Sequence, residues 1–276
     1  MAAIIDYIAS SAHPNLKVDP VTGLLRTDGT ETPVSWMNSV IDGRPVIPRT
    51  GFLVEFNAMW YNALRFAAKL FDEQAEHAAD TERYTAMADS MKEPFVETFV
   101  NDYGYMFDYV NGNFADPSVR PNMVVAIGLD YSPLDRRQRK RVLDVVTREL
   151  LTTKGLRTLS PKSYGYEPYY TGGPREREQQ QHQGPARPWL MGFYAEAYLK
   201  IFGLSGVSYI DRILIGFEEE MSWGCIGSLS QQIRIACQPA IPGQRRHLAR
   251  HQCRRSAPHT ANLKEIQPVK PHNRSA

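Results

Sequence analysis

The chain has 276 residues, of which 42% are hydrophobic and 11% aromatic, so the composition suits a packed globular core and excludes a disordered chain. Its formal net charge of +2 is unevenly divided, because residues 232–276 hold nine Lys or Arg against one acid, which leaves 23 basic and 29 acidic residues in 1–231. The acidic body gives no reason to expect a nucleic-acid partner, and no apolar run is long enough to span a membrane.

The first half of the chain predicts loops followed by two long helices. Residues 12–50 are rich in Pro, Gly, Asp and Thr with little apolar periodicity, which favours loops and short extended pieces. Residues 54–71 are apolar around most of the helical wheel, as in a helix that is buried on most sides. Residues 80–100 predict an ordinary amphipathic helix, and 103–109 alternate aromatic and small residues as in a short hairpin strand.

The second half predicts further helices around one long connection. Residues 120–129 favour a short buried helix and 134–151 a charged amphipathic helix. Residues 152–187 are rich in Gly, Pro and Tyr, and loops of this length are usually functional or disordered. Residues 189–202 and 209–223 predict two more apolar helices. Long helices joined alternately by short turns and long polar loops indicate a mostly α fold, with helices paired as in an α/α barrel.

The character of the sequence changes after Gln231. Residues 232–276 contain no aromatic residue, four of the seven histidines and no apolar periodicity. Such a segment cannot bury enough apolar surface to fold alone. We therefore expect one domain over 1–231 and a basic tail over 232–276 that is disordered or out of frame.

The cysteines and the start of the chain bear on cofactors and location. Cys225, Cys237 and Cys253 show no metal-ligand spacing, so we expect no metal site and no cofactor. The first ten residues lack the basic and apolar regions of a signal peptide. A cytoplasmic location is the expectation.

A collinear set of short strings stands out along the chain. The strings are Ser-Trp-Met-Asn at 35–38, Asp-Gly-Arg-Pro-Val-Ile-Pro-Arg at 42–49, Val-Glu-Phe-Asn-Ala-Met-Trp-Tyr-Asn-Ala-Leu at 54–64, Arg-Pro-Asn at 120–122, Leu-Leu-Thr at 150–152, Gly-Leu-Arg-Thr-Leu-Ser-Pro at 155–161, His-Gln-Gly at 182–184, Pro-Trp-Leu at 188–190 and Gly-Ser-Leu-Ser at 227–230. In order and spacing, from about residue 20 to 231, they resemble the C-terminal glucosidase domain of bacterial-type glycogen debranching enzymes.

The resemblance implies a fold, a substrate and a reaction. That family folds as an (α/α)6 barrel and hydrolyses the α-1,6-linked glucose at glycogen branch stubs. We therefore expect an all-α fold, a partial (α/α)6 barrel with long loops, and a branched α-glucan such as glycogen or limit dextrin as the partner. The first helical hairpins of such a barrel would precede Met1, so the resemblance also predicts a domain that is incomplete at its start.

The two catalytic positions implied by the resemblance carry amides. Glycoside hydrolysis by inversion needs one carboxylic acid to protonate the leaving oxygen and one carboxylate to activate water. The resemblance places the acid directly after Trp-Met and the base directly after Gly-Ser-Leu-Ser, where this sequence has Asn38 and Gln231. An amide does not shuttle a proton near neutral pH, which argues against catalysis by this chain.

Two neighbouring carboxylates are candidates to replace the missing acid. Glu55 opens the buried helix, and it is either a catalytic or sugar-binding group or a buried carboxylate that caps its helix. Asp42 lies four residues after Asn38 and precedes Gly43. Because Asp-Gly is typical of a turn, we favour the turn for Asp42 over a substrate contact.

Aromatic and polar side chains in the strings are candidates for sugar binding. Trp36, Trp60 and Trp189 are candidates for a platform under the apolar face of a sugar, with core packing as the alternative. We favour core packing for Trp60, because its helix is apolar on most sides. Arg49 and Asn57 are weaker candidates for hydrogen bonds to sugar hydroxyls.

The polar loop before residue 189 is a further candidate. His182 and Gln183 form a polar cluster before a buried helix, which is a common position for a binding site. The family pattern here runs Tyr-His-Gln-Gly-Thr-Val-Trp-Pro-Trp, so one aromatic wall of the site is expected to be missing. The residues that replace its Tyr, Thr, Val and first Trp are Gln181, Pro185, Ala186 and Arg187.

The tail reads differently in a second reading frame. Permitted codons for residues 237–263, read one base later, can spell a Gly-rich loop followed by an amphipathic helix, as the end of a barrel requires. We hypothesise a single-base insertion or deletion near codons 231–236. The isolated chain is then predicted to be unstable or prone to aggregation.

Three interpretations of function remain open. The first is a glycosidase of the debranching class that hydrolyses α-1,6-linked glucose. The second is a catalytically silent protein that binds glucan, which Asn38 and Gln231 favour. The third is a non-functional fragment.

Overall fold

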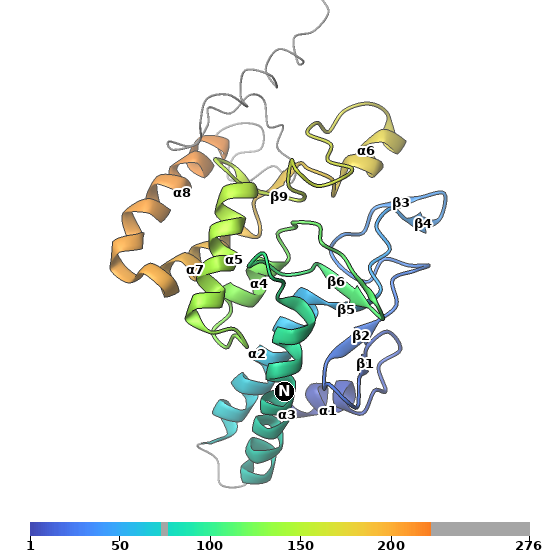
Figure 1. The fold of residues 1–276 in the computed structure, drawn as a ribbon, viewed down its shortest axis with the longest axis vertical. Helices are drawn as coiled ribbons and strands as arrows, with labels where there is room; N and C mark the ends of the chain where they lie inside the picture. The colour runs from blue at the N-terminus through green and yellow to red at the C-terminus, as the bar shows by residue number, and fades with distance from the viewer. Residues whose placement is uncertain (73–76, 222–276) are drawn as a thin grey trace, which may run out of the picture. The chain divides into compact units, whose positions relative to one another are not determined.

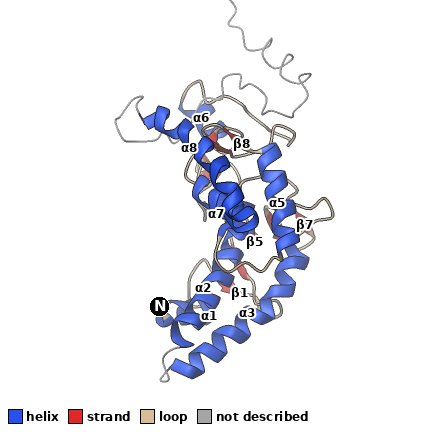
Figure 2. Cartoon of the chain, turned by 90° about the vertical axis from the view of Figure 1, so that its left-hand side faces the viewer, coloured by secondary structure: helices blue, strands red, loops and turns tan. Residues whose placement is uncertain are grey.

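The computed structural model describes residues 1–72 and 77–221, and these belong to one compact unit of the chain (Figure 1). Roughly half of the described residues are helical, and helices make up most of the regular structure in Figure 2. The mostly helical class predicted from the sequence is confirmed at this level. The expectation of a purely α fold is not met, because three small antiparallel sheets accompany the helices, and the described helices do not close into a barrel.

Most of the helices fall close to the predicted segments, but the first and the sixth were not predicted from the sequence. They are α1 (Ala2–Ala9), α2 (Val54–Asp72), α3 (Ala78–Phe99), α4 (Met123–Gly128), α5 (Arg136–Glu149), α6 (Pro174–Gln180), α7 (Met191–Phe202), the 3-10 helix η2 (Gly203–Gly206) and α8 (Val207–Met221). Helix α5 begins two residues later than predicted because Asp135 and Gln138 form a capping box, in which each side chain bonds the other's backbone N–H. The predicted residues 222 and 223 of the last helix, the Gln231 position and the whole tail, including its second reading frame, lie outside the described residues.

The strands are too short to have been seen as periodic segments in the sequence. They are β1 (Lys17–Val18), β2 (Leu25–Thr27), β3 (Val40–Ile41), β4 (Arg44–Pro45), β5 (Gly51–Leu53), β6 (Tyr109–Asn111), β7 (Phe114–Ala115), β8 (Leu151–Thr152), β9 (Gly155–Arg157) and β10 (Ala186–Arg187). They form a five-stranded sheet in the order β1-β2-β5-β6-β7, a three-stranded sheet in the order β10-β9-β8, and the β3–β4 hairpin.

Two loop predictions need correction. The hairpin strand predicted over 103–109 begins at Tyr109, so that β6 and β7 pair across Gly112, which has a φ of 58°. The connection 152–187 is not one long loop, because it carries β9, β10 and α6. This segment takes its structure from backbone pairing between strands that are far apart in the sequence. Such pairing leaves no local periodicity, so the sequence did not predict it.

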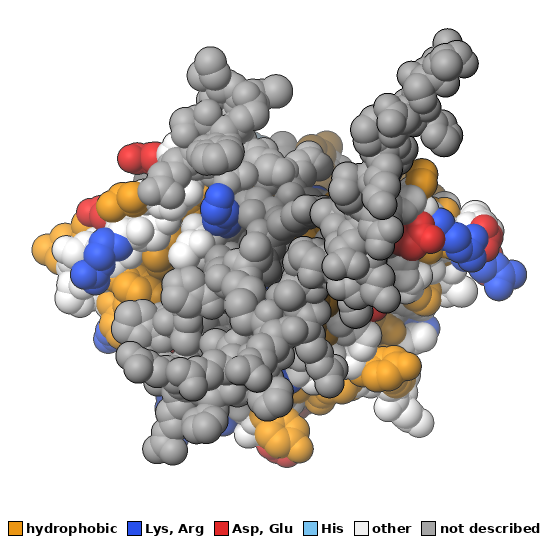
Figure 3. All heavy atoms as spheres, turned by 90° about the horizontal axis from the view of Figure 1, so that it is seen from above, with side chains coloured by type: hydrophobic (Ala, Val, Ile, Leu, Met, Phe, Trp, Pro, Cys, Tyr) orange, Lys and Arg blue, Asp and Glu red, His pale blue; other side chains and the backbone are white. Residues whose placement is uncertain are grey.

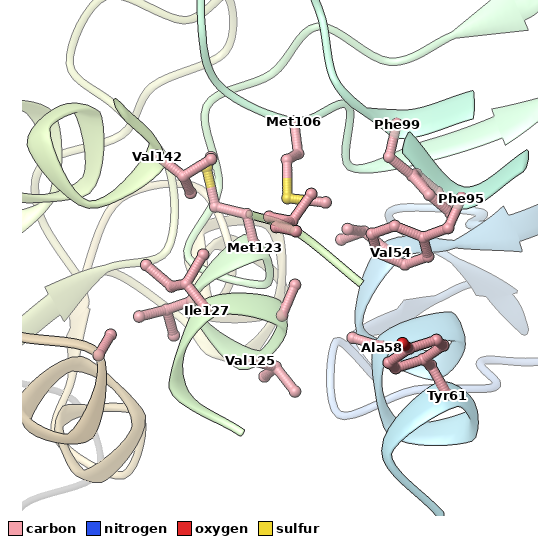
Figure 4. Close-up of a cluster of buried hydrophobic side chains, with 14 of the residues drawn as sticks. Val54, Ala58, Tyr61, Phe95, Phe99, Met106, Met123, Val125, Ile127 and Val142 are labelled. Carbon is pink, nitrogen blue, oxygen red and sulfur yellow. The ribbon is translucent and has the colours of Figure 1, made fainter. Parts of the chain in front are cut away.

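The core is built around α4, whose six residues are all buried. Figure 4 shows Met123, Val125 and Ile127 of this helix near side chains of α2 and α5 and beside Met106. A Cβ on Gly128 would lie 2.4 Å from the carbonyl oxygen of Phe193, so the end of α4 approaches the backbone of α7 closely. Burial on all sides of one short helix fixes α2, α5 and α7 around it.

Helix α2 is buried on most sides, as its composition predicts, but it keeps one exposed edge. Trp60 is 4% exposed and belongs to the core, whereas Met59, Phe66 and Leu70 are 43–45% exposed along one side of the helix. These three positions recur at helical spacing. Helix α2 therefore presents an apolar edge as well as an apolar core face.

Candidate functional site

Two segments far apart in the sequence meet at the candidate site. The loop 35–38 between β2 and β3 contacts the loop 181–184 between α6 and β10. The ring of Trp36 lies edge-on to His182, with centroids 5.1 Å apart, and edge-on to Trp189, with centroids 5.3 Å apart. Trp36 is half-buried and Trp189 is 48% exposed, so this aromatic cluster reaches the surface. We call Trp36, Asn38 and Trp189 the aromatic face.

Asn38, the position expected to hold the acid, is exposed at this face. Its backbone N–H donates to Nε2 of His182 over 3.1 Å, which fixes the backbone of the loop. The residue is therefore exposed, and it carries an amide at the position where the resemblance predicts a carboxylic acid.

His182 is a neutral, structural histidine in this arrangement. It is 2% exposed, and burial, followed by the charges of Arg187, Arg120 and Arg49, lowers its pKa from 6.5 to about 3. Because Nε2 accepts the Asn38 N–H, the geometry assigns the ring proton to Nδ1, for which the described residues offer no hydrogen-bond partner.

Arg49 is the centre of a buried ion cluster rather than part of the exposed face. Its Nη2 donates to Oε2 of Glu55 over 2.8 Å, its Nη1 binds Oε1 of the same carboxylate, and its Nε lies 2.8 Å from Oδ2 of Asp108. Burial alone would lower the pKa of Arg49, but the charges of Asp108 and Glu55 outweigh burial and raise it. Both oxygens of Glu55 are engaged by Arg49, so the structure favours the buried, structural alternative for this carboxylate.

Asp108 and Asn122 connect the ion cluster to the aromatic face. Asn122 donates from Nδ2 to Oδ1 of Asp108 over 2.7 Å and accepts the indole N–H of Trp36 at Oδ1 over 2.7 Å. Sequence reasoning did not single out Asp108, since its only distinction there is its place at the end of an aromatic-rich segment. Asn122 could have been identified from the sequence, because it belongs to the Arg-Pro-Asn string.

Arg120, from the same string, holds the second loop in place. It is 5% exposed and donates to the carbonyl oxygen of His182 over 2.7 Å, to that of Thr158 over 3.2 Å and to Oε1 of Gln183 over 3.0 Å. Gln183 thus accepts a bond inside the fold. The string Arg-Pro-Asn therefore positions both loops, through Arg120 on one side and Asn122 on the other.

Asn57 and Asp42 are each engaged by partners within the fold. Asn57 is fully buried and bonds the backbone of Leu25 through both side-chain groups and the carbonyl of Leu53 over 3.0 Å, joining β2, β5 and α2. Asp42 lies in the turn of the β3–β4 hairpin with a φ of 52° and pairs with Arg175 of α6 over 2.7 Å, which lowers its pKa. The turn predicted from the Asp-Gly pair is therefore present in the structure.

A separate hollow of about 210 Å³ lies beside β2, and none of the predicted site residues lines it. Its lining residues are Pro14, Asn15, Lys17, Arg26, Thr27, Asp28 and Thr50. Among residues 1–72 and 77–221 there is no group of three or more His, Cys, Asp or Glu placed to hold a metal ion. No helix in these ranges is long and apolar enough to cross a membrane.

Comparison with known proteins identifies a family whose model matches most of the chain. The model of a family described as amylo-alpha-1,6-glucosidase matches residues 1–235. The chain is 24% identical over 224 residues to the glycogen debranching enzyme of Saccharomyces cerevisiae, a match that covers 66% of this chain and 15% of the yeast protein. The chain thus spans a small share of that relative's length.

Proposed function

Because the chain belongs to the amylo-alpha-1,6-glucosidase family, as a debranching-type glycoside hydrolase domain, we propose that its aromatic face binds branched α-glucan at an α-1,6-linked glucose. The observation that carries the proposal is the exposed Asn38 beside a tryptophan pair that reaches the surface. The finer fold that we propose with it is a partial (α/α)6 barrel over 1–231, of which the described helices form a part.

The chemistry of the face suits a sugar. The half-exposed ring of Trp189 offers an apolar surface, and the edge-on contact with Trp36 holds it in place. The amide of Asn38 can both donate to and accept from a hydroxyl. A flat apolar surface with an adjoining polar group matches the two kinds of surface that a glucose ring presents.

We further propose that this chain binds its glucan without hydrolysing it. Asn38 occupies the position expected for the acid, and Gln231 occupies the position expected for the base. Glu55 and Asp108 do not replace the acid, because both are buried and paired with Arg49. The Arg49 guanidinium engages both carboxylates inside the fold, so neither is free to contact a leaving oxygen.

Hydrolysis of α-1,6-linked glucose by this chain is the second candidate, and membership of the family favours it. It requires a carboxylic acid in reach of the glycosidic bond, and the nearby Glu55 and Asp108 are buried and paired with Arg49. Measured glucose release therefore separates the two candidates, whereas binding alone does not.

Calorimetric titration with branched limit dextrin tests the binding proposal. Trp189→Ala is expected to weaken binding about fivefold, since stacking on an aromatic ring contributes on the order of 1 kcal/mol. Tyr103→Ala is the matched control, because Tyr103 is 83% exposed and lies outside the aromatic face. Equal affinities for the original chain and the Trp189 variant would remove the aromatic face from the proposal.

A further inference from the structure

A tyrosine-rich segment, residues 164–170, lies in the connection between β9 and α6. Four of its seven residues are tyrosines, namely Tyr164, Tyr166, Tyr169 and Tyr170. Tyrosine beside glycine is typical of loops that bind a ligand, because the ring gives a large, rigid contact area with a polar end at a low cost in conformational entropy. The binding proposed for the aromatic face makes no use of these side chains.

Backbone contacts fix the tyrosine-rich segment against the loop 181–184. The N–H of Glu167 donates to the carbonyl oxygen of Gln183 over 2.6 Å. A Cβ on Gly184, which has a φ of 157°, would lie 2.2 Å from the carbonyl oxygen of Glu167 and 2.9 Å from Cε2 of Tyr166. This approach therefore requires glycine, and it holds the two segments side by side.

The loop 181–184 also contacts the aromatic face. The ring of His182 lies edge-on to Trp36, with centroids 5.1 Å apart. Gln183, the next residue along the chain, accepts the bond from Glu167. One loop of four residues thus touches the aromatic face on one side and the tyrosine-rich segment on the other, which makes the two surfaces neighbours.

Two of the four tyrosines are exposed. Tyr166 and Tyr170 are half-buried, whereas Tyr169 is 40% exposed and Tyr164 is fully exposed. A fully exposed ring packs against nothing in the fold, so the fold gains little from an aromatic side chain at residue 164. The exposed rings are therefore available to a ligand.

The chemistry of an exposed tyrosine matches a sugar. Its ring offers a flat apolar surface, and its hydroxyl can both donate and accept a hydrogen bond. On the face shown in Figure 3, the visible hydrophobic side chains are interspersed with Lys, Arg, Asp and Glu. Single rings in such a mixed surface suit a sugar chain, whereas a protein partner is favoured by a broad apolar patch.

We propose that Tyr164 and Tyr169 extend the glucan-binding surface beyond the aromatic face, which makes this chain prefer a branched glucan whose main chain is long. The aromatic face contacts the α-1,6-linked glucose, and the two tyrosines contact glucose units farther along the main chain. The inference rests on the proposed binding of glucan and adds a preference for chain length.

Calorimetry with two branched oligosaccharides tests the preference. Both carry a single α-1,6-linked glucose, and the main chain of the long form continues for several units on both sides of the branch. The original chain is expected to bind the long form about 25-fold more tightly than the short form, about fivefold for each stacked ring. Tyr164→Ala should lower this preference about fivefold, and Tyr164→Phe, which keeps the ring, should retain most of it.

The double variant Tyr164→Ala, Tyr169→Ala should abolish the preference and leave the affinity for the short form and the melting temperature unchanged. Tyr103→Ala, the matched control, should change neither affinity, because Tyr103 is 83% exposed but lies outside the tyrosine-rich segment. Trp189→Ala should weaken the binding of both forms.

The outcomes separate this inference from the proposed function. Equal affinities of the original chain for the two forms, or a preference that the double variant retains, would overturn the length preference and leave glucan binding at the aromatic face intact. Failure of both forms to bind would refute the proposed glucan binding, and the length preference with it.

Discussion

His182 and Asn38 are 144 positions apart in the sequence, and a single hydrogen bond joins them at the candidate site. The bond needs a neutral imidazole, since a protonated ring has no acceptor atom. Burial and three neighbouring guanidinium groups keep the ring neutral. His182 therefore acts as a fixed acceptor that positions the loop of Asn38, and it is unsuited to carry protons near neutral pH.

This role predicts a pH dependence of stability. The pKa of His182 is about 3 in the folded chain and 6.5 without the fold, so the unfolded chain binds an extra proton between these values. The stability that the neutral, buried His182 contributes to the fold is fully present above pH 6.5 and is lost as the pH falls toward 3.

His182→Gln keeps an acceptor oxygen and does not titrate. Chemical denaturation between pH 7 and 4 should show that the original chain loses stability faster than this variant, by at most about 1.4 kcal/mol per pH unit. Parallel curves for the two chains would contradict the neutral, buried histidine.

At the scale of elements, α4 is the part on which the site depends. Asn122 precedes this helix and links Trp36 to Asp108, and its neighbour in the string, Arg120, holds the loop of His182. The close approach of Gly128 to α7 sets the position of the helix, and Trp189 lies just before α7. Packing of α4 on α7 thus places both halves of the aromatic face.

Two glycines give a matched test of this packing. Gly128→Ala puts a Cβ at 2.4 Å from the backbone of Phe193, and the resulting overpacking should cost about 1–3 kcal/mol of unfolding free energy. Gly192→Ala, in α7, meets no atom within 4 Å and should be neutral or stabilising by up to about 1 kcal/mol. Denaturant unfolding of both variants measures the difference. Equal effects would show that α4 and α7 are not in close contact.

The longer helices and α4 could be predicted from the sequence because each carries its own apolar pattern, whereas the short helices α1 and α6 were not predicted. The string 54–64 gave α2, and the six apolar residues of α4 gave a short buried helix. The sheets could not be predicted, since strands of two or three residues show no alternation and are defined by partners elsewhere in the chain.

The same limit applies to the site. Trp36, Asn38 and His182 could be named from their strings, and the structure brings them together. The ion pairs of Arg49 with Glu55 and Asp108 could not be foreseen, because a sequence does not show which buried charges meet.

At the scale of the whole molecule, a debranching-type domain carries an aromatic face with amides at the positions expected for its acid and base. Buried groups behind that face hold its residues in position. The family membership and the missing carboxylates together lead to binding without hydrolysis as the central claim.

Glucose release from branched limit dextrin tests that claim most directly. The assay compares this chain with the double variant Asn38→Asp, Gln231→Glu, while calorimetry confirms that both bind the dextrin. We predict binding without glucose release by this chain, and release at least about 10²-fold faster by the double variant, as a general acid and base contribute. Glucose release by this chain at the rate of the double variant would contradict the claim and establish it as a working hydrolase.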